Sequence, residues 1–263
     1  MKKQEIDKNL DISFPKDGHN ELIKIENNSF WFNHRNNIIE TIIEKFPIDG
    51  DFADIGGGNG YQLMKIAELN PSNKNILIEP GQIGCINAKN RKIKEVFNMT
   101  FEEFDFNAYN INGIGLFDVL EHIENDKEFL SKLLYKLKKG ARIYITVPAH
   151  NFLWSEVDTH GGHFRRYNKK SLNKLTEGLN VEIECFSYFF SYLLPISLFV
   201  RAIPFRIFKK KETKKLMEEE KTHHSPNNFI LKVFSFFEKI EIKKLKKSTV
   251  KLGASCFLVI KKK

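Results

Sequence analysis

Three glycines at alternate positions form the stretch of this chain whose residue types and spacing point most directly to chemistry. They are Gly56, Gly58 and Gly60, and an apolar run that ends at Ile55 leads into them. Glycine lets a backbone turn sharply and come close to a ligand, and the amide hydrogens that open a following helix face that ligand. The spacing therefore favours a loop that binds a nucleotide-type cofactor, with a plain turn as the alternative.

Two common nucleotide-binding loops fit this stretch poorly. A dinucleotide loop of the G-x-G-x-x-G kind would need its third glycine at Tyr61, and a P-loop would need Gly-Lys followed by Ser or Thr. The observed G-x-G-x-G spacing, with Asp54 two places ahead of it, resembles motif I of class I S-adenosylmethionine-dependent methyltransferases. The resemblance implies that Gly56 and Gly58 contact the cofactor. It also places Asp54 where a carboxylate can face the positively charged sulfur, unless Asp54 only caps the turn.

Glu79 stands at the end of the next predicted strand, 75–78. In an open α/β sheet, an acidic residue about twenty positions beyond the glycine loop can accept both ribose hydroxyls of a bound nucleotide. We expect Glu79 to bind the cofactor in this way; the alternative is a solvated loop carboxylate.

A second informative stretch, 117–123, reads Phe-Asp-Val-Leu-Glu-His-Ile. It resembles the motif after strand four in small-molecule methyltransferases, including the ubiquinone-pathway O-methyltransferases, and this implies that Phe117 lines the cofactor. If a helix begins here, Asp118, Glu121 and His122 face the same way and could bind a divalent cation, as their counterparts in that branch are thought to do. The alternative is a capping box, in which the two carboxylates satisfy free backbone amides.

Many side chains suited to substrate binding follow the predicted strand 141–147. They are Trp154, His163, Arg165, Arg166 and Tyr167. The end of a fifth parallel strand lies over the cofactor's reactive group, so we expect these residues to handle the methyl acceptor.

The pattern V-P-A, W-S, D and G-H-x-R-R-Y across this stretch resembles a group of bacterial class I methyltransferases of largely undefined substrate. F-W-F-x-x-R near the start of the chain belongs to the same resemblance, which covers about residues 29–260. Arg35 matches an arginine ahead of motif I in the ubiquinone-pathway enzymes, and the resemblance makes it a candidate cofactor contact.

These stretches together predict an enzyme that transfers the methyl group of S-adenosylmethionine to an oxygen of a small-molecule, glycan or lipid-linked acceptor. Methyl transfer needs orientation and one base for the acceptor's proton. His163 is the first candidate for this base and His122 the second. A nicotinamide-dependent oxidoreductase is the rival enzyme class, disfavoured by the missing third glycine, and a non-catalytic cofactor-binding protein is a third hypothesis.

Alternating strand and helix patterns must position these residues. The predicted strands are 52–55, 75–78, 95–99, 113–117, 141–147, 181–186 and 254–260, and the predicted helices between them are 61–69, 86–93, 125–137 and 171–179, with one more at 38–46 ahead of the sheet. This order predicts an α/β protein with a Rossmann-like, doubly wound sheet of seven strands, mostly parallel with the last strand antiparallel.

We expect one methyltransferase domain at 29–263, after a polar N-terminal segment at 1–28. A helical, apolar and basic insertion at 187–250 would precede the last strand. At 263 residues with 41% hydrophobic content, the chain is long enough to bury one substantial core.

Charge is concentrated near the C-terminus. The whole chain carries +9, and residues 206–263 alone hold 17 Lys and Arg against 6 Glu. A local basic tail favours contact with an anionic surface over the extended basic face that nucleic acid needs. No Asn-Pro-Pro-Tyr-like motif follows the fourth strand, which also argues against methylation of nucleic-acid bases. Three isolated cysteines and a polar first segment without a signal-peptide pattern favour a cytoplasmic protein.

The segment 186–200 is uncharged and aromatic, and it is broken by Pro195. It is too short to span a bilayer, which takes about 20 apolar residues. It is either a helix that closes the acceptor pocket or, with the basic residues Lys209, Lys210 and Lys211, a peripheral membrane contact.

Overall fold

Strands and helices alternate along the chain as the sequence predicts. The structure is a computed structural model, and it describes residues 18–207 and 227–263. The strands are β1 Asp51–Ile55, β2 Asn75–Ile78, β3 Glu95–Phe97, β4 Ile111–Phe117, β5 Arg142–Pro148, β6 Val181–Phe189 and β7 Ser255–Lys262. The helices are α1 Gly18–Ile25, α2 Phe30–Lys45, α3 Tyr61–Leu69, α4 Gln82–Asn90, α5 Asp126–Lys136, α6 Glu156–His160, α7 Lys169–Thr176, α8 Leu193–Ile196, α9 Ile203–Ile207 and α11 Asn228–Lys247.

The strands form one sheet in the order β3-β2-β1-β4-β5-β7-β6. All neighbours are parallel except β7, which runs antiparallel to both β5 and β6. The predicted seven-stranded, mostly parallel sheet is therefore confirmed. The chain order reverses between β1 and β4, and ligands of open α/β sheets bind at the carboxyl ends of the strands beside such a reversal.

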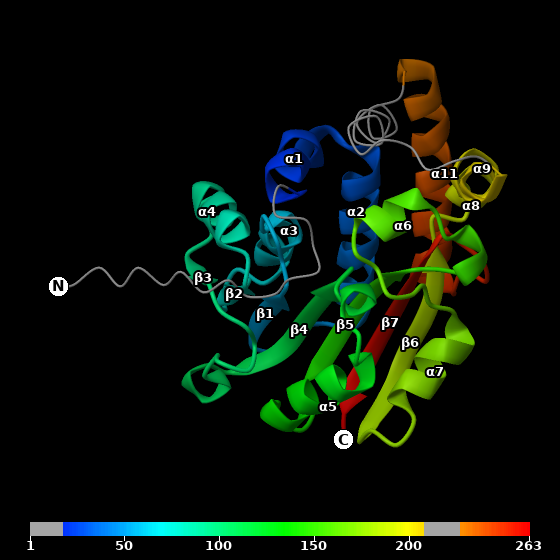
Figure 1. Cartoon of the computed structure of the whole chain (residues 1–263). Helices are drawn as coiled ribbons and strands as arrows, with labels where there is room; N and C mark the ends of the chain where they lie inside the picture. The colour runs from blue at the N-terminus through cyan, green and yellow to red at the C-terminus, as the bar shows by residue number, and fades with distance from the viewer. Residues whose placement is uncertain (1–17, 208–226) are drawn as a thin grey trace.

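Helices cover both faces of the sheet. Helices α5 and α7 lie on the face turned toward the viewer in Figure 1, whereas α2 contacts α3 and α11 behind it. Ser29 fixes the start of α2, because its hydroxyl accepts the backbone N–H groups of Trp31 and Phe32. Apolar side chains of the central strands fill the space between the layers and are almost fully buried, among them Phe52, Ile114 and Ile143.

Three helices begin earlier than the sequence patterns predict. Helix α2 starts at Phe30 instead of residue 38. Helix α4 starts at Gln82 instead of residue 86 and contains Gly84, a weak helix former. A β-carbon on Gly84 would lie 2.9 Å from the carbonyl oxygen of Gly58, so close packing against the glycine loop explains this residue. Helix α7 starts at Lys169 because the Asn168 side chain caps it.

The sixth strand is longer than the predicted 181–186. It continues to Phe189, which pairs with Ser255 of β7. After Phe189 the chain leaves the sheet for α8, a π-helical turn at Ser197–Ala202 and α9, and it returns through α11. The insertion thus departs from and rejoins the sheet at neighbouring positions. The three lysines expected to take part in membrane contact, 209–211, lie outside the described residues.

A buried carboxylate ties α11 to the rest of the fold. Glu241 accepts the backbone N–H groups of Phe190 and Ser191, both at 2.8 Å, and the Ser191 hydroxyl at 2.6 Å. The ring of His34 on α2 also contacts it, at 2.8 Å. These hydrogen bonds outweigh the effect of burial and lower the pKa of Glu241. The second half of α11 is therefore fixed to α2 and to the end of β6.

The described part of the predicted N-terminal segment is helical. Helix α1 is followed by a 3-10 turn at Glu26–Asn28, and both lie beside the glycine loop. Asn59 of that loop donates to the carbonyl oxygen of His19 at 3.0 Å and to the Glu26 carboxylate at 3.1 Å. Arg91 completes the contact with Glu26 at 2.6 Å. Residues 18–28 thus form a wall of the site described next.

Candidate active site

One cavity of about 1850 Å³ opens at the carboxyl ends of β1, β2, β4 and β5. A pocket for one ligand usually occupies about 300–1,000 Å³, so this space can hold a cofactor and a second molecule together. The glycine loop and Glu79 line what we call the cofactor side. Glu121, His122, His163 and part of α11 line what we call the acceptor side.

The glycine loop has the geometry that its spacing predicts. Gly56, Gly58 and Gly60 have φ angles of +67°, +54° and +74°, a region that residues with a β-carbon rarely adopt. Gly57 is restricted by space instead, because a β-carbon there would lie 2.4 Å from Leu77 and 2.6 Å from an Asp54 oxygen. The loop therefore presents bare backbone to the cavity.

Glu79 lies at the end of β2 and reaches across to this loop. Its carboxylate accepts the N–H groups of Gly58 at 2.8 Å and Gly81 at 2.6 Å. Burial raises the pKa of Glu79, and these two hydrogen bonds oppose the rise. The side chain is thus held rigidly against the cavity with one N–H group on each oxygen, which leaves each oxygen able to accept another hydrogen bond.

Asp54 lies beneath the loop and is not part of the cavity wall, contrary to the expectation that it faces the cofactor's sulfur. Its carboxylate is fully buried, and neither oxygen has a hydrogen-bond partner among the described residues. Burial raises the pKa of Asp54 to about 8, and the negative charge of Glu79 adds to the rise while Arg35 opposes it. The residue is accordingly a buried acid that supports the loop from below.

Asp118 begins no helix, so the helical arrangement considered for Asp118, Glu121 and His122 is wrong. Asp118 has a φ of +56°, and only a short 3-10 turn, Leu120–His122, follows before α5 starts at Asp126. The carboxylate of Asp118 pairs with Arg35 and accepts the Thr146 hydroxyl at 3.0 Å. Both of its oxygens are therefore engaged by residues outside the predicted group.

Arg35 lines the cavity and links α2 to the end of β4. Its guanidinium lies 4.6 Å from the ring centre of Trp31 and 5.1 Å from that of Phe32. Stacking and the Asp118 pair together fix its orientation. Phe117, the last residue of β4, also lines the cavity and stacks on Phe52.

Glu121, His122 and His163 come together on the acceptor side. A ligand atom of each lies within 4.8 Å of the others, and the two imidazole rings meet edge to face at 4.7 Å. Burial raises the pKa of Glu121, with a further rise from the Asp118 charge. Burial also lowers the pKa of His122 to about 4, and His163 contributes in the same direction. His122 is accordingly neutral near pH 7.

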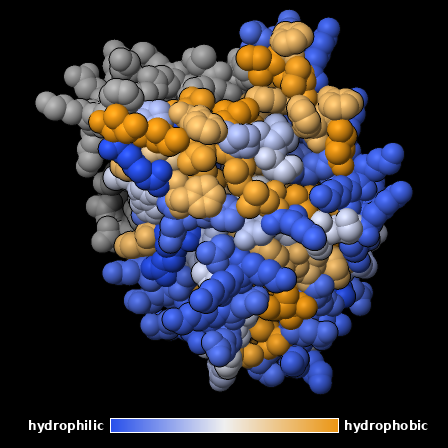
Figure 2. Space-filling view, turned by 90° about the vertical axis from the view of Figure 1, so that its right-hand side faces the viewer, coloured by the Kyte–Doolittle hydropathy of each residue, from blue (hydrophilic) through white to orange (hydrophobic). Residues whose placement is uncertain are grey.

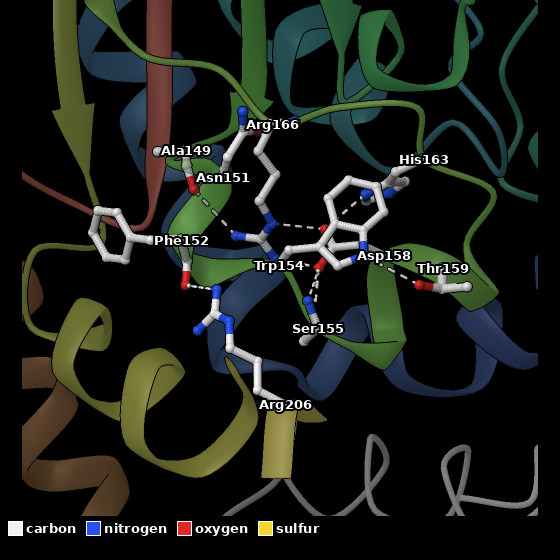
Figure 3. A network of polar contacts seen from close by, with 10 residues as sticks. All are labelled: Ala149, Asn151, Phe152, Trp154, Ser155, Asp158, Thr159, His163, Arg166 and Arg206. Carbon is white, nitrogen blue, oxygen red and sulfur yellow. Dashed lines mark hydrogen bonds and ion pairs between the residues drawn. The ribbon is translucent and has the colours of Figure 1, made fainter. Parts of the chain in front are cut away.

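Asp158 organises the loop that follows β5 (Figure 3). Arg166 contacts both carboxylate oxygens, at 2.7 and 2.9 Å, and His163 Nδ1 lies 2.9 Å from one of them. The Ser155 N–H donates to the other oxygen at 2.8 Å. Burial alone would raise the pKa of Asp158, but His163 and Arg166 lower it to about 2. Arg166 lines the cavity, yet its charge is already paired.

Three of the predicted acceptor-binding residues do not line the cavity. Tyr167 is 2% exposed, and its hydroxyl lies 2.8 Å from Asp126, which also pairs with Arg165 at 2.9 Å. The Trp154 indole donates to Thr159 at 3.2 Å. These contacts hold the loop after β5 against α5 and α6, so the structure gives these side chains a supporting place.

A family described as a methyltransferase domain matches residues 32–185, which is more than half of the chain. The chain belongs to this family. The methyltransferase predicted from the sequence is therefore confirmed. No curated protein matches the chain.

Solved structures with the same fold share little sequence with this methyltransferase. The plantazolicin methyltransferase BpumL, in complex with a monoazolic desmethylPZN analog and SAH, is 14% identical with a TM-score of 0.57, covering 94% of this chain and 91% of that one. An O-methyltransferase from a trans-AT PKS multienzyme of Brevibacillus brevis, in complex with S-adenosyl-L-homocysteine, is 15% identical with a TM-score of 0.51, covering 86% and 71%. The [4+2]-cyclase SpnF is 16% identical with a TM-score of 0.51, covering 86% and 80%. These likenesses confirm the predicted class I fold. A cyclase shares this fold with methyltransferases, so the fold alone does not identify the acceptor.

Sequence patterns missed two walls of this methyltransferase's cavity. His19 and Glu26 line the cofactor side, but nothing in their polar surroundings sets them apart from a surface segment. Phe229, Ile230 and Val233 of α11 line the acceptor side. Val233 lies four positions after Phe229 and three after Ile230, a spacing that shows an apolar helix face, although not what that face contacts.

Proposed function

We propose that this methyltransferase transfers a methyl group from S-adenosylmethionine to an oxygen atom of a small-molecule, glycan or lipid-linked acceptor. The observation that carries the proposal is that one cavity joins the glycine loop and Glu79 to the Glu121, His122 and His163 cluster. Both reactants can therefore meet without leaving the protein.

The cofactor side suits S-adenosylmethionine. The Glu79 carboxylate would accept the two ribose hydroxyls, and the bare backbone at Gly56 and Gly58 lets the nucleoside approach closely. Arg35 and Phe117 would line the same molecule. When bound, the cofactor supplies a methyl group on a positively charged sulfur. Asp54 would act through the loop that it supports.

His163 is the better of the two bases. Its Nδ1 lies against Asp158, which favours the tautomer with hydrogen on Nδ1 and leaves Nε2 to accept a proton. His122 has a pKa of about 4, so it is a weaker base near neutral pH. His163 would take the hydroxyl proton as the acceptor oxygen attacks the methyl carbon.

The acceptor side favours a molecule with an apolar part. Phe229, Ile230 and Val233 of α11, together with Ile196 and Val200, form its wall. Such a wall excludes water and suits an aromatic, polyketide-like or lipid-linked acceptor more than a free sugar. Two structural neighbours also support an acceptor with an apolar part. One is a complex with an azolic compound, and the other belongs to a polyketide enzyme.

A binding and transfer experiment tests this function. We expect calorimetry to detect S-adenosylmethionine and S-adenosylhomocysteine binding and no NAD binding. Incubation with methyl-labelled cofactor and fractionated small-molecule and lipid extracts should then label an apolar fraction. Binding of NAD but not of S-adenosylmethionine would contradict the proposal. A labelled methyl group that base does not release would exclude a methyl ester. Mass spectrometry of the product would then distinguish a methyl ether from methylation of nitrogen or carbon.

We also propose that the enzyme contacts an anionic membrane surface beside its acceptor side. No helix within residues 18–207 and 227–263 is long and apolar enough to cross a bilayer. Exposed apolar residues nevertheless gather on α11 and the π-helical turn, where Phe229 is 76% exposed, Phe199 67% and Phe236 61%. Figure 2 shows apolar side chains collected over the upper part of this face. Lysines such as Lys232 and Lys239 occupy the same helix.

Vesicle co-sedimentation tests the membrane contact. Basic residues near an anionic surface contribute about 1 kcal/mol each, and this attraction is screened by salt. We expect the enzyme to pellet with vesicles rich in phosphatidylserine at low salt, and to remain in the supernatant with neutral vesicles or at high salt. Failure to pellet under the first condition would leave the apolar face as a lid of the acceptor site.

A further inference from the structure

Glu121, His122 and His163 have the composition and spacing of a metal-binding site. Their ligand atoms all lie within 4.8 Å of one another, although the residues come from two segments, the turn after β4 and the loop after α6. A backbone hydrogen bond of 2.7 Å, from the Phe164 N–H to the Glu121 carbonyl oxygen, holds the two segments together. The cluster is therefore built into the fold.

One carboxylate oxygen of the cluster has no other role. Glu121 is 1% exposed, and its Oε2 atom has no hydrogen-bond partner among the described residues. Leaving a buried carboxylate oxygen unpaired is costly, whereas a bound cation would satisfy it. Glu121 also lines the cavity, as His122 and His163 do.

Both histidines are oriented by a second group, as metal ligands usually are. His163 Nδ1 lies 2.9 Å from Asp158, which Arg166 and Ser155 hold in place. His122 makes a hydrogen bond to the backbone of Gly161. In His163 the hydrogen bond to Asp158 fixes Nδ1, so Nε2 is the nitrogen that would reach an ion.

We propose that Glu121, His122 and His163 bind a divalent transition-metal ion at the acceptor side of the cavity. Two imidazoles and one carboxylate suit Zn²⁺, Mn²⁺, Fe²⁺ or Co²⁺, whereas Mg²⁺ prefers oxygen ligands. Asp118 is outside this site, because Arg35 and Thr146 engage both of its oxygens. The three ligands occupy one side of the ion, and positions toward the cavity stay open.

The ion would act on the acceptor, a role that rests on the function proposed above. An acceptor hydroxyl that enters an open position is polarised and loses its proton to water more readily. The acceptor oxygen then forms the new O–C bond while the S–C bond of the cofactor breaks, and S-adenosylhomocysteine leaves. His163 would be a ligand in this case, and the metal would replace it as the agent that activates the oxygen.

Cobalt(II) titration tests the site without using activity. We expect protein stripped with a chelator to bind one Co²⁺ per chain with visible absorption that Zn²⁺ removes. Glu121→Gln and His163→Asn should each weaken binding by more than about tenfold. Asp158→Asn, which removes the carboxylate that orients His163, should also weaken it. His160→Asn and Asp118→Asn are matched controls that should bind Co²⁺ as the unchanged protein does.

Circular dichroism and S-adenosylmethionine affinity verify that each variant is folded. Absence of Co²⁺ binding in the unchanged protein would overturn the site. Loss of binding in Asp118→Asn with full binding in His163→Asn would overturn this ligand set in favour of Asp118, Glu121 and His122. Because the titration contains no acceptor, it can succeed when O-methylation fails, and the two proposals are separable.

Discussion

On the cofactor side of the cavity Glu79 is held by backbone N–H groups, whereas on the acceptor side His163 is held by a side chain that other groups hold in turn. Glu79 rests on the N–H groups of Gly58 and Gly81. His163 instead depends on Asp158, which depends on Arg166 and Ser155. Backbone N–H groups hold Glu79 as long as the glycines keep their spacing. The orientation of His163, in contrast, depends on every side chain in its series of contacts. A substitution on the cofactor side should therefore have a local effect, whereas one on the acceptor side should also disturb the neighbouring side chains.

The largest effect is expected at His163. His163→Ala should lower turnover by about 10² to 10⁴, the usual contribution of a general base, while S-adenosylmethionine affinity stays unchanged. Stopped assays with labelled cofactor measure the first quantity and calorimetry the second. His160→Ala, on the neighbouring helix, is the control. Full turnover in His163→Ala, together with inactive His122→Ala, would move the base to the turn after β4.

Arg166 tests whether a substitution on the acceptor side also affects His163 through Asp158. Arg166→Ala leaves the buried Asp158 carboxylate without its bidentate partner, a change that typically costs about 3–5 kcal/mol for a buried pair. We expect lower thermal stability and a loss of turnover through His163, which a differential scan and the labelled assay would detect. An Arg166→Ala variant with normal melting and turnover would mean that the Asp158 network does not position the acceptor side.

A more local effect is expected on the cofactor side. Glu79→Ala should weaken S-adenosylmethionine binding by about 1.5–3 kcal/mol, because a charged acceptor of two hydroxyls is lost. Calorimetry should show the change without altered circular dichroism, and Glu182→Ala on the exposed part of β6 is the control. Equal affinity of the Glu79→Ala and unchanged proteins would remove Glu79 from the cofactor site.

Asp54 offers a pH test of the same side. Its pKa of about 8 lies well above the value of about 3.9 in an unfolded chain, so the folded protein binds more protons between these values. The stability that Asp54 contributes is thus fully present below about pH 4 and is lost as the pH rises toward 8. Asp54→Asn should raise the melting temperature at pH 8 by about 3 °C or more, and by less at pH 5. An equal difference at both pH values would contradict a buried, protonated Asp54.

The smallest effect concerns the outer face of α11. Phe236 is 61% exposed, so Phe236→Ser should weaken vesicle binding by about 1–2 kcal/mol without changing turnover on a soluble acceptor. Co-sedimentation at a series of lipid concentrations gives the affinity. The exposed Tyr135, on the far helix α5, provides the control substitution Tyr135→Ser. Equal vesicle binding by the two variants would exclude α11 from the contact.

Sequence patterns predicted the fold and the cofactor side better than the acceptor side, and the reason is physical. Gly56, Gly58 and Glu79 lie at fixed sequence distances along consecutive strand and turn units, so spacing alone locates them at the cavity. Tyr167 and Trp154 have side chains that could bind a ligand, but the sequence does not show that Asp126 and Thr159 occupy them. Burial determines such roles, and it depends on contacts between distant segments.

The turn after β4 shows the same limit. Asp118, Glu121 and His122 have helical spacing, yet the positive φ of Asp118 and its pair with Arg35, 83 positions away, separate it from the other two. Its place in the cluster is taken by His163, which lies 41 positions beyond His122 in the chain. No local sequence pattern could predict that His163 lies beside Glu121 and His122.

The insertion between β6 and β7 begins and ends at paired residues, since Phe189 lies opposite Ser255. A segment whose two ends are neighbours can be exchanged for one of different length without moving the strands that carry it. In this protein such a segment supplies the apolar wall of the acceptor side but none of the glycine loop. Acceptor preference can accordingly diversify, in evolution or by grafting between homologous chains, as a module that leaves cofactor binding intact.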